Sequence, residues 1–343
     1  MDGFPRPAPF SRHDTAPYGP HRRGMNILFV TSTRIGDAVM STGLLSHFMS
    51  RFPEAGITVA CGALPAPLFA AAPGVVRVIG LVKRPLAGHW LRLWAAVVGT
   101  AWDVVVDLRA SGLAWTLRAR ERHVMRRPDN ALHRVEALAG LVGLTSPPSP
   151  TLWLSARHHG EAARLVPAGP PVLGVGPAAN WPGKIWPAER FVALIGRLTG
   201  PDGLLPGARV AVFGGPDEKP LARPVLEAIP ERRIDLVGAV DLPTAGACLQ
   251  RCALFVGNDS GLMHIAAAAG TPTLGLFGPS PAAHYAPWGR HCAAAEAAIP
   301  YAELVGAPDF DHRAGETLMT SLSVEAVEDT ARALWRRLSG EAA

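Results

Sequence analysis

The sequence predicts an α/β protein in which two doubly wound, parallel-sheet domains follow one another along the chain. The length of 343 residues exceeds what one hydrophobic core usually serves, so two domains are expected. Short apolar runs alternate with helical patterns, as is typical of parallel sheets. A proline-rich stretch, residues 145–150, interrupts the alternation and marks the expected linker.

The first half of the chain is expected to form a domain over residues 25–150. Its last helical pattern covers 131–144, with Asn130 as the N-cap. The second half repeats the alternation over residues 151–322, and a final helix over 324–338, with Ser323 as its N-cap, lies in a C-terminal segment, 323–343. The expected strands are 26–31, 57–61, 75–81, 102–107, 172–175, 209–213, 234–237, 253–256 and 273–277.

The chain ends and the cysteines give expectations about the cellular location. Residues 1–24 lack the apolar stretch of a secretory signal, and we expect a disordered arm there. His89, Arg92 and Asp103 interrupt the most apolar region, which argues against a transmembrane helix. The four cysteines show neither zinc spacing nor a disulfide framework, so a reducing cytoplasm is expected.

Residues 257–264, Gly-Asn-Asp-Ser-Gly-Leu-Met-His, join an expected strand to a helix of small residues. Ser260 and Gly261 would stand at the helix start, where unpaired amides and the helix dipole favour an anion such as phosphate. A carboxylate at Asp259 would repel phosphate unless it accepts hydrogen bonds from sugar hydroxyls or amides. The motif therefore indicates a ligand with both phosphate and hydroxyl groups. An ordinary turn, with Asp259 and Ser260 as competing N-caps, is the alternative.

A second junction leads from strand 26–31 through a polar loop to a helix that begins near Asp37. Ligands of open α/β sheets bind at the carboxyl ends of strands, so Asp37 is placed to act as a general base. A carboxylate that only stabilises the helix N-terminus is the alternative. Arg109 ends the fourth expected strand on the same side, placed either to bind an acidic acceptor or to pair with Asp107.

A third junction follows strand 172–175 and carries Lys184 in a loop rich in glycine and proline. The chain has 33 basic residues, of which only Lys83, Lys184 and Lys219 are lysines. An ammonium group at the carboxyl end of a strand could neutralise a leaving diphosphate. A solvated loop charge is the alternative, because lysine is usually exposed.

Together the three segments resemble glycosyltransferase family 9, the ADP-heptose:lipopolysaccharide heptosyltransferases. The resemblance covers residues 25–338 and implies a GT-B architecture, in which two Rossmann-like domains face a central cleft and the last helix crosses back toward the first domain. The matching motifs are Gly36-Asp37, Lys184-Ile185-Trp186-Pro187, Asn-Asp-Ser-Gly-Leu-Met-His at 258–264, Gly270-Thr271-Pro272 and Leu-Phe-Gly-Pro at 276–279.

The resemblance implies roles for residues at all three junctions. Asp37 matches the catalytic base, and Lys184 matches the cation that compensates the diphosphate charge. The nucleotide-sugar site corresponds to Asp259, Ser260 and Gly261.

Four further residues are expected at the site, although no specific motif fixes their positions. Glu218 resembles an acidic residue that contacts the nucleotide ribose, although Asp217 is adjacent. His264 lies one helical turn after the anion site and faces either the phosphates or the core. Arg34 and Arg109 are expected to bind the acceptor.

The implied activity is an inverting transfer of heptose from ADP-heptose to a lipopolysaccharide-core or related glycan. The leaving diphosphate would be met by Lys184 and the helix amides, so we expect no metal ion and no cofactor. The partners are then a nucleotide sugar and a lipid-linked or glycan acceptor, reached by contact with the inner face of the cytoplasmic membrane. No nucleic-acid partner is expected, since base-reading elements are lacking.

The net charge of +5 and the basic run at 118–127 leave two interpretations open. The five arginines of the run could meet an anionic acceptor or membrane, or form a solvated helix and loop face. Two other functions also stay open: a noncatalytic sugar-nucleotide-binding protein of the same fold, and a dinucleotide-dependent oxidoreductase. The latter is disfavoured because residues 31–36 lack the Gly-x-Gly-x-x-Gly turn.

Overall fold

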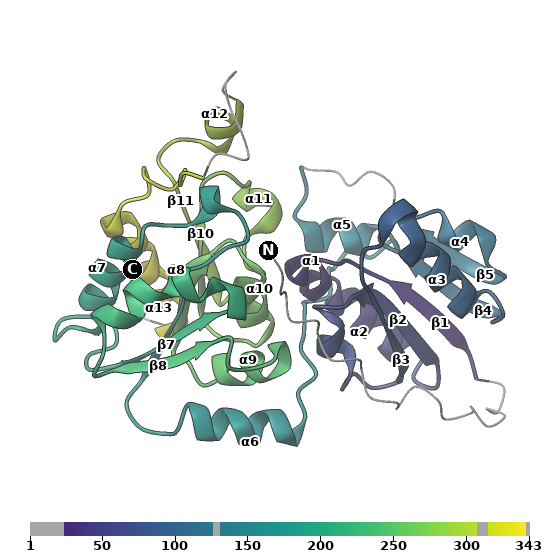
Figure 1. The fold of residues 1–343 in the computed structure, drawn as a ribbon, viewed down its shortest axis with the longest axis horizontal. Coiled ribbons are helices and arrows are strands. Elements are labelled where there is room, and N and C mark those ends of the chain that lie inside the picture. Colours follow the sequence, from purple (N-terminus) through teal and green to yellow (C-terminus); the bar gives the residue numbers. More distant parts are fainter. Residues whose placement is uncertain (1–23, 126–130, 307–314, 341–343) are drawn as a thin grey trace, which may run out of the picture.

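The computed structural model describes residues 24–125, 131–306 and 315–340. Within these ranges the chain forms two parallel sheets, one of five and one of six strands. Figure 1 shows each sheet in its own half of the molecule, with helices α1 and α10 between the halves. The α/β fold class predicted from the alternation is thereby confirmed.

The first domain is built on the sheet order β3-β2-β1-β4-β5, in which all neighbours pair in parallel. Fully buried apolar side chains from β1 and β4 fill both faces of the sheet, as expected for a doubly wound fold. The strands are β1 Asn26–Val30, β2 Gly56–Gly62, β3 Val75–Leu81, β4 Trp102–Asp107 and β5 Ala119–Val124.

Two groups of helices cover the two faces of the first sheet. Residues from α1, α2 and α5 share one hydrophobic cluster with the second domain, whereas residues from α3 and α4 form a separate cluster with the opposite face. Helices α3 and α4 therefore lie away from the second domain (Figure 1). The helices are α1 Ile35–Met40, α2 Thr42–Arg51, η1 Ala66–Phe69, η2 Pro85–Ala87, α3 Gly88–Val97, α4 Leu113–Thr116 and α5 Arg134–Gly140.

The second domain has the sheet order β11-β10-β9-β6-β7-β8, again parallel throughout. Helices α9 and α10 face the first domain, whereas α7, α8 and α13 contribute to the cluster on the other face. The strands are β6 Val172–Gly176, β7 Arg209–Gly214, β8 Arg233–Val237, β9 Leu254–Asn258, β10 Thr273–Phe277 and β11 Cys292–Glu296. The helices are η3 Pro182–Lys184, α7 Ala188–Thr199, η4 Pro216–Glu218, α8 Lys219–Ala228, α9 Leu242–Leu249, α10 Gly261–Ala268, α11 Ala282–Tyr285, α12 Tyr301–Gly306 and α13 Val324–Ser339.

The expected return of the last helix to the first domain is wrong. Helix α13 buries Val327, Ala331 and Leu334 in the cluster of the second domain and contacts α7, β10 and β11. Its amphipathic pattern is satisfied there, so no apolar face is left for the first sheet. The predicted N-cap is confirmed, because Ser323 Oγ accepts a hydrogen bond from the Ala326 amide at 3.1 Å.

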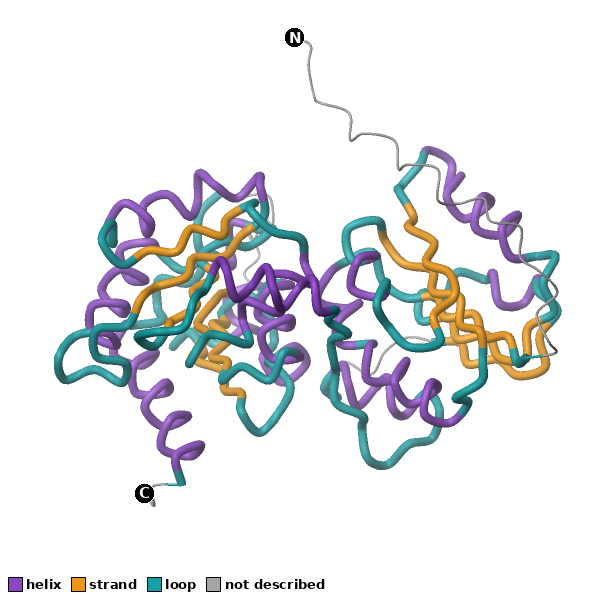
Figure 2. The backbone as a smooth tube through the Cα atoms, turned by 90° about the horizontal axis from the view of Figure 1, so that it is seen from below, coloured by secondary structure: helices purple, strands orange, loops and turns teal. Residues whose placement is uncertain are grey.

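The chain crosses between the sheets through the segment that leads to α6, Ala156–Leu165. Near the crossing, the Thr151 amide donates to Thr42 Oγ1 on α2 at 2.8 Å. Helix α6 then packs against α9 of the second domain. Figure 2, seen from below, shows the two sheets side by side with helices of both domains between them.

Three local features of the structure differ from what the sequence predicted. In the arginine run, Arg120 and Arg122 lie on strand β5 rather than on a helix and loop face, Arg118 directly precedes the strand, and Arg126 and Arg127 lie outside the described residues. Helix α5 begins at Arg134 with His133 as its N-cap, while the predicted cap, Asn130, also lies outside them. Strand β11 was not predicted. Among the helices described, none has the length and hydropathy needed to cross a membrane.

Candidate active site

The carboxyl ends of β1 and β9 meet at the domain boundary and flank a cavity of about 350 Å³. Residues from both domains line it, so the cavity depends on how the domains pack. The lining residues are Thr33, Arg34, Ile35, Gly36, Asp37, Met40 and Leu64 of the first domain, and Asn180, Lys184, Glu218, Asp259, Ser260, Gly261, His264 and Tyr285 of the second.

Two glycines allow helices α1 and α10 to approach each other beside the cavity. A Cβ atom on Gly261 would lie 2.7 Å from the Ile35 Cβ, and a Cβ on Gly36 would lie 2.8 Å from the His264 ring. Both distances are shorter than a van der Waals contact, so a side chain at either position would push the domains apart. The glycines of the Gly36-Asp37 and Ser260-Gly261 motifs therefore have a packing role.

Lys184 and Asp259 form an ion pair on the second-domain wall of the cavity. Lys184 Nζ lies 2.5 Å from Asp259 Oδ2, with 23% of the lysine and 8% of the aspartate side chain exposed. An ammonium group has three N–H donors, so two remain for oxygens of a bound ligand. Neither residue follows its structural alternative, since Lys184 is not a solvated loop charge and Asp259 does not cap the helix.

Hydrogen bonds to distant parts of the chain brace the loop that carries Lys184. The buried Asn258 side chain accepts from the Trp186 amide at 3.1 Å and donates to the Pro177 carbonyl at 3.0 Å. The Trp186 indole is fully buried and donates to the Leu322 carbonyl at 2.9 Å. The motif residues Asn258 and Trp186 thus position Lys184 from behind.

Ser260 stands at the N-cap position of α10 but does not cap the helix. Its side chain accepts no hydrogen bond from the first turn, and its Oγ atom is buried without a hydrogen-bond partner among the residues that the structure describes. A buried hydroxyl without a partner costs free energy unless a ligand or water satisfies it. Together with the free amides of the helix start, this hydroxyl provides a site for an anion.

Asp37 lies in the first turn of α1 and faces the cavity from the first domain. Ser32 Oγ donates to Asp37 Oδ2 at 3.3 Å, and Arg134 Nε lies 4.0 Å from Oδ1. The Asp37 side chain is 23% exposed, so an acceptor hydroxyl can reach it. The position satisfies both interpretations of Asp37, the helix-terminal carboxylate and the general base.

Arg134 was not predicted from the sequence, although its guanidinium lies beside Asp37. Within the described ranges, its Nε is buried without a hydrogen-bond partner. The side chain of His133 caps α5 by accepting from the Val135 amide at 3.2 Å, and His133 Nε2 lies 2.9 Å from the Ala286 carbonyl of the second domain. This cap fixes the start of α5 against the end of α11, and Arg134, the first residue of α5, lies beside Asp37.

The buried His264 and the half-buried Tyr285 line the cavity together with the two carboxylates, Asp37 and Asp259. Burial lowers the pKa of the His264 imidazole, and the Asp259 and Asp37 carboxylates oppose this shift. Burial also raises the pKa of the Tyr285 phenol, and the charge of Asp37 adds to the increase. His264 lines the cavity, as one of its two interpretations required, but only 5% of its surface is exposed. Tyr285 was not predicted.

The remaining predicted residues divide between the cavity and its surroundings. Glu218 lines the cavity, whereas its neighbour Asp217 does not, and Glu218 Oε2 accepts from the Gly215 amide at 2.6 Å. Arg34 lines the cavity and is exposed. Arg109 is also exposed but is not among the lining residues, and its backbone amide donates to Asp107 Oδ1 at 2.9 Å.

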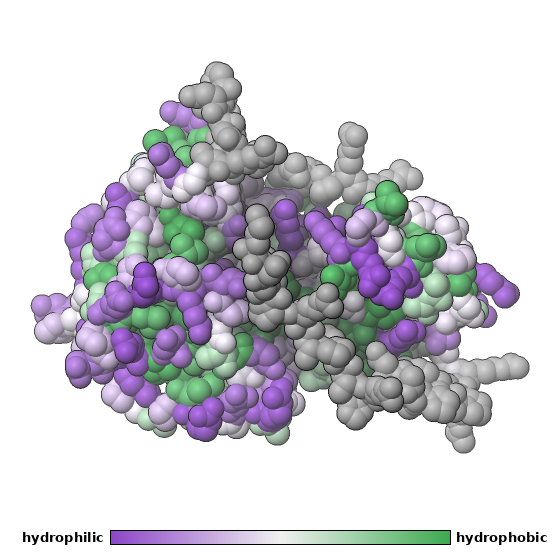
Figure 3. Space-filling model, in the orientation of Figure 1, coloured by the Kyte–Doolittle hydropathy of each residue, from purple (hydrophilic) through white to green (hydrophobic). Residues whose placement is uncertain are grey.

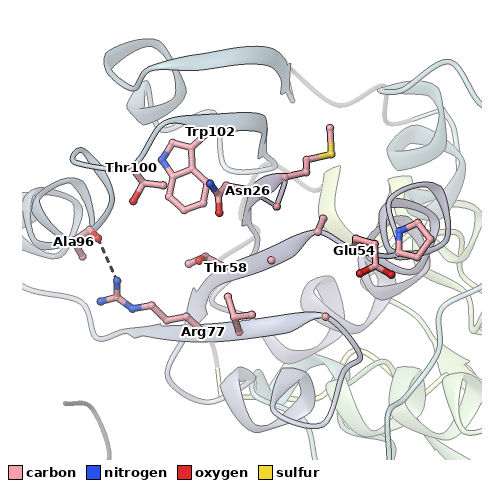
Figure 4. Close-up of a pocket in the computed structure, with 14 residues that line it drawn as sticks. Asn26, Glu54, Thr58, Arg77, Ala96, Thr100 and Trp102 are labelled. Atoms are coloured by element: carbon pink, nitrogen blue, oxygen red, sulfur yellow. Dashed lines mark hydrogen bonds between the residues drawn. The ribbon is translucent and has the colours of Figure 1, made fainter. Parts of the chain in front are cut away.

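A larger cavity, of about 660 Å³, lies at the amino ends of the first sheet's strands, opposite the interdomain cavity. Its lining includes the amino ends of β1 and β4, with Asn26, Arg77 and Trp102 (Figure 4). Ligands of open α/β sheets bind at the carboxyl ends, and this cavity contains none of the motif residues. The smaller, interdomain cavity is therefore the candidate active site.

The family model described as glycosyltransferase family 9 (heptosyltransferase) matches residues 91–306, more than half of the chain. The chain belongs to glycosyltransferase family 9. Family membership identifies it as a glycosyltransferase and sets aside the oxidoreductase.

Curated relatives of this glycosyltransferase include two bacterial heptosyltransferases. Lipooligosaccharide heptosyltransferase 2 of Haemophilus influenzae is 24% identical over 297 residues, which cover 75% of this chain and 84% of that protein. Lipopolysaccharide heptosyltransferase 2 of Escherichia coli K12 is 26% identical over 304 residues, which cover 75% and 83%.

Solved structures of the family share the fold. A family 9 glycosyltransferase of Veillonella parvula superposes with a TM-score of 0.74 at 21% identity and covers 91% of this chain and 97% of that one. The ADP-heptose lipopolysaccharide heptosyltransferase II of E. coli gives 0.69 at 22% identity, with 93% and 100% covered. The GT-B architecture of this glycosyltransferase, two Rossmann-like domains around an interdomain cavity, is thus established.

Proposed function

We propose that this glycosyltransferase transfers heptose from ADP-heptose to a lipopolysaccharide-core acceptor, with inversion at the anomeric carbon. The names of the relatives support heptose and lipopolysaccharide, and the name of the E. coli structure supports ADP-heptose as the donor. The observation that carries the mechanism is the shared cavity, in which Asp37 of one domain faces Lys184, Asp259 and Ser260 of the other.

The acceptor side of the reaction depends on Asp37. Its carboxylate takes the proton of an acceptor hydroxyl, whose oxygen attacks the anomeric carbon of the heptose. The bond from that carbon to the diphosphate oxygen breaks on the opposite face, and ADP leaves with the electron pair. A positioned base contributes about 10²- to 10⁴-fold to such a step. Arg34 at the rim and Arg134 beside Asp37 are placed to attract an anionic acceptor.

The donor side depends on groups that are fixed before the donor arrives. Lys184 directs its two free N–H groups toward the diphosphate, while Asp259 holds the ammonium and accepts hydrogen bonds from sugar hydroxyls. Ser260 Oγ and the amides at the start of α10 bind phosphate oxygens. Fixed donors aimed at developing charge are each worth about 3 to 4 kcal/mol. Glu218 has one carboxylate oxygen left for a ribose hydroxyl.

We propose that Lys184 and the helix amides suffice for charge compensation without a metal ion. The chain carries one Asp-x-Asp pair, Asp309 and Asp311, which lies outside the described residues. Transfer should therefore persist in excess EDTA, and an activity restored only by Mg²⁺ or Mn²⁺ would contradict this part of the proposal. Substituting both aspartates by asparagine tests the same point without a chelator.

The decisive experiment is a transfer assay with ADP-heptose and a purified heptose-deficient core acceptor. ADP release, product mass and the anomeric configuration of the product by NMR should together show inverting heptose transfer. Parallel reactions with UDP- and GDP-sugars define the nucleotide. If ADP-heptose binds, as measured by calorimetry, but no sugar moves to any core acceptor, the noncatalytic binding protein is the better description.

A further inference from the structure

The first domain bears an exposed apolar and basic surface next to the cavity, and we propose that this surface docks onto an anionic lipid bilayer. This proposal rests on the proposed function, because a lipid-linked acceptor would be presented at such a bilayer. We call it the α3 surface. It consists of Leu64, Val82, Leu86, Leu91 and Trp94, with Lys83, Arg84 and Arg92 among them.

The apolar members of the α3 surface are exposed far beyond what a folded domain requires. Leu86 is 102% exposed, Leu64 72%, Leu91 67%, Val82 64% and Trp94 39%. Single exposed apolar residues are ordinary, but four of these five fall within 13 consecutive residues, 82–94. Such a concentration marks an interaction surface.

The backbone of the loop before α3 is strained at two residues of this surface. Leu86 and Ala87 have positive φ angles of 52° and 55°, a left-handed conformation that residues with a Cβ rarely adopt. Helix α3 is meanwhile fixed to the sheet by Leu93 and Val97, which are buried. The helix therefore packs against the sheet through Leu93 and Val97 while Leu91 and Trp94 point to solvent.

The α3 surface reaches the rim of the active-site cavity. Strands β2 and β3 pair as far as Gly62 and Leu81, and the Ala63 amide donates to the Leu81 carbonyl at 3.2 Å. The two loops thus leave the sheet together, with Leu64 on one and Val82 on the other. Leu64 also lines the cavity. A bilayer against this surface would lie at the mouth of the acceptor site.

The positive charge of the α3 surface favours an anionic partner. No Asp or Glu occurs from residue 55 to residue 102. Lys83, Arg84 and Arg92 are exposed, and none of them takes part in an ion pair recorded in the described part of the chain. Figure 3 shows hydrophilic and hydrophobic surface side by side over the half of the molecule that contains α3. A second copy of the same surface would bring like charges together, whereas an anionic bilayer complements both its charge and its apolar side chains.

The test is vesicle flotation with the full chain, using phosphatidylethanolamine/phosphatidylglycerol vesicles and neutral phosphatidylcholine vesicles. The unaltered chain should bind the anionic vesicles preferentially. The double variant Leu86→Asn/Leu91→Gln should lose about tenfold or more in affinity, since two apolar side chains no longer enter the bilayer. Asparagine tolerates the positive φ at position 86, and glutamine suits the helix, so folding is preserved.

Charge and control variants separate the contributions. Lys83→Gln and Arg84→Gln should each reduce affinity about fivefold and weaken the salt dependence. The control is Leu338→Gln, since Leu338 is 41% exposed on α13 of the other domain, and it should bind like the unaltered chain. Failure of the unaltered chain to bind anionic vesicles, or equal binding by the double variant, overturns the proposal. So does self-association by light scattering that the double variant abolishes, because a second copy would then occupy the surface.

A pair of transfer assays keeps this proposal distinct from the proposed function. The double variant should transfer heptose to a delipidated, water-soluble core acceptor at the unaltered rate but should act more slowly on acceptor embedded in vesicles. If the unaltered chain transfers heptose to neither acceptor, the proposed function fails while flotation still decides the membrane proposal.

Discussion

The two walls of the active-site cavity differ in how firmly they hold their reactive groups. On the second-domain wall, Lys184 and Asp259 pair at 2.5 Å, and Asn258 and Trp186 brace the loop behind them. On the first-domain wall, Asp37 has only a hydroxyl at 3.3 Å and a guanidinium at 4.0 Å among the described residues. A diphosphate is best met by fixed charge, whereas a base needs a lone pair that stays free and within reach of the proton it accepts. The difference thus matches the division between donor and acceptor.

The largest effect is expected for the loosely held group. Asp37→Asn should lower kcat by about 10² to 10⁴ while leaving the calorimetric Kd for ADP nearly unchanged, because the amide cannot take the proton. Asp217→Asn, at an exposed carboxylate outside the cavity, is the control and should retain full activity. An Asp37→Asn variant with more than about a tenth of normal turnover would remove Asp37 from the role of base.

The firmly held wall should respond in both binding and chemistry. Lys184→Met should reduce kcat/KM by about 10² to 10³ and also weaken ADP binding, since it removes a fixed cation and leaves Asp259 facing the diphosphate. Lys219→Met is the matched control, because this lysine is exposed and does not line the cavity. Unchanged kinetics in the Lys184 variant would return it to the status of a surface charge.

A smaller effect on stability and turnover is expected at the contact between α1 and α10, the helices that bring the two walls together. Gly261→Ala places a methyl group 2.7 Å from Ile35, so it should lower stability by about 1 to 3 kcal/mol and reduce turnover by separating α1 from α10. Gly196→Ala in α7 has no heavy atom within 4 Å of the new methyl group and should be neutral or stabilising. Thermal unfolding and steady-state kinetics of both variants check this, and equal behaviour of the two would show that the helix contact is unimportant.

The smallest effect concerns the buried imidazole between the walls. Since burial lowers the pKa of His264 in the folded state, the unfolded chain binds more protons below its ordinary pKa of 6.5. The contribution of His264 is therefore fully present above that value and declines as the pH falls, by at most about 1.4 kcal/mol per pH unit. Thermal unfolding from pH 7.5 to 5 should show a shallower loss for His264→Gln than for the unaltered chain. A slope that does not change would mean that His264 is solvated and titrates normally.

The central strands were predictable because burial on both faces demands continuous apolar runs. Strand β4, for example, has the predicted bounds, Trp102–Asp107, and is almost entirely buried. All four edge strands are under a weaker demand for burial: the edge strands β3 and β8 were predicted, whereas the edge strands β5 and β11 were missed. In β5, arginines take structural partners instead: Arg120 pairs with Asp103, and Arg122 donates to three backbone carbonyls.

The site was predictable where a motif carries the residue and not where domain packing brings it in. Asp37, Lys184 and Ser260 follow strands at the ligand side of their sheets, and the structure brings them to one cavity. Arg134 and Tyr285 belong to helices α5 and α11, whose local sequences show no such signal. Tyr285 lines the cavity only because the two domains meet, and Arg134 lies beside Asp37 only because α5 packs near α1, so both positions are properties of the whole fold.

Residues 317–322, far along the sequence from Lys184, help to hold the loop that carries it. Besides the indole bond to Leu322, the Leu318 amide donates to the Gly183 carbonyl at 3.0 Å, and Thr317 Oγ1 donates to the Ile185 carbonyl at 2.5 Å. Truncation ahead of this segment, or a fusion that pulls on it, would misplace the ammonium group of Lys184, which we propose meets the departing nucleotide. Turnover should therefore fail in such shortened proteins even when the two Rossmann halves still fold.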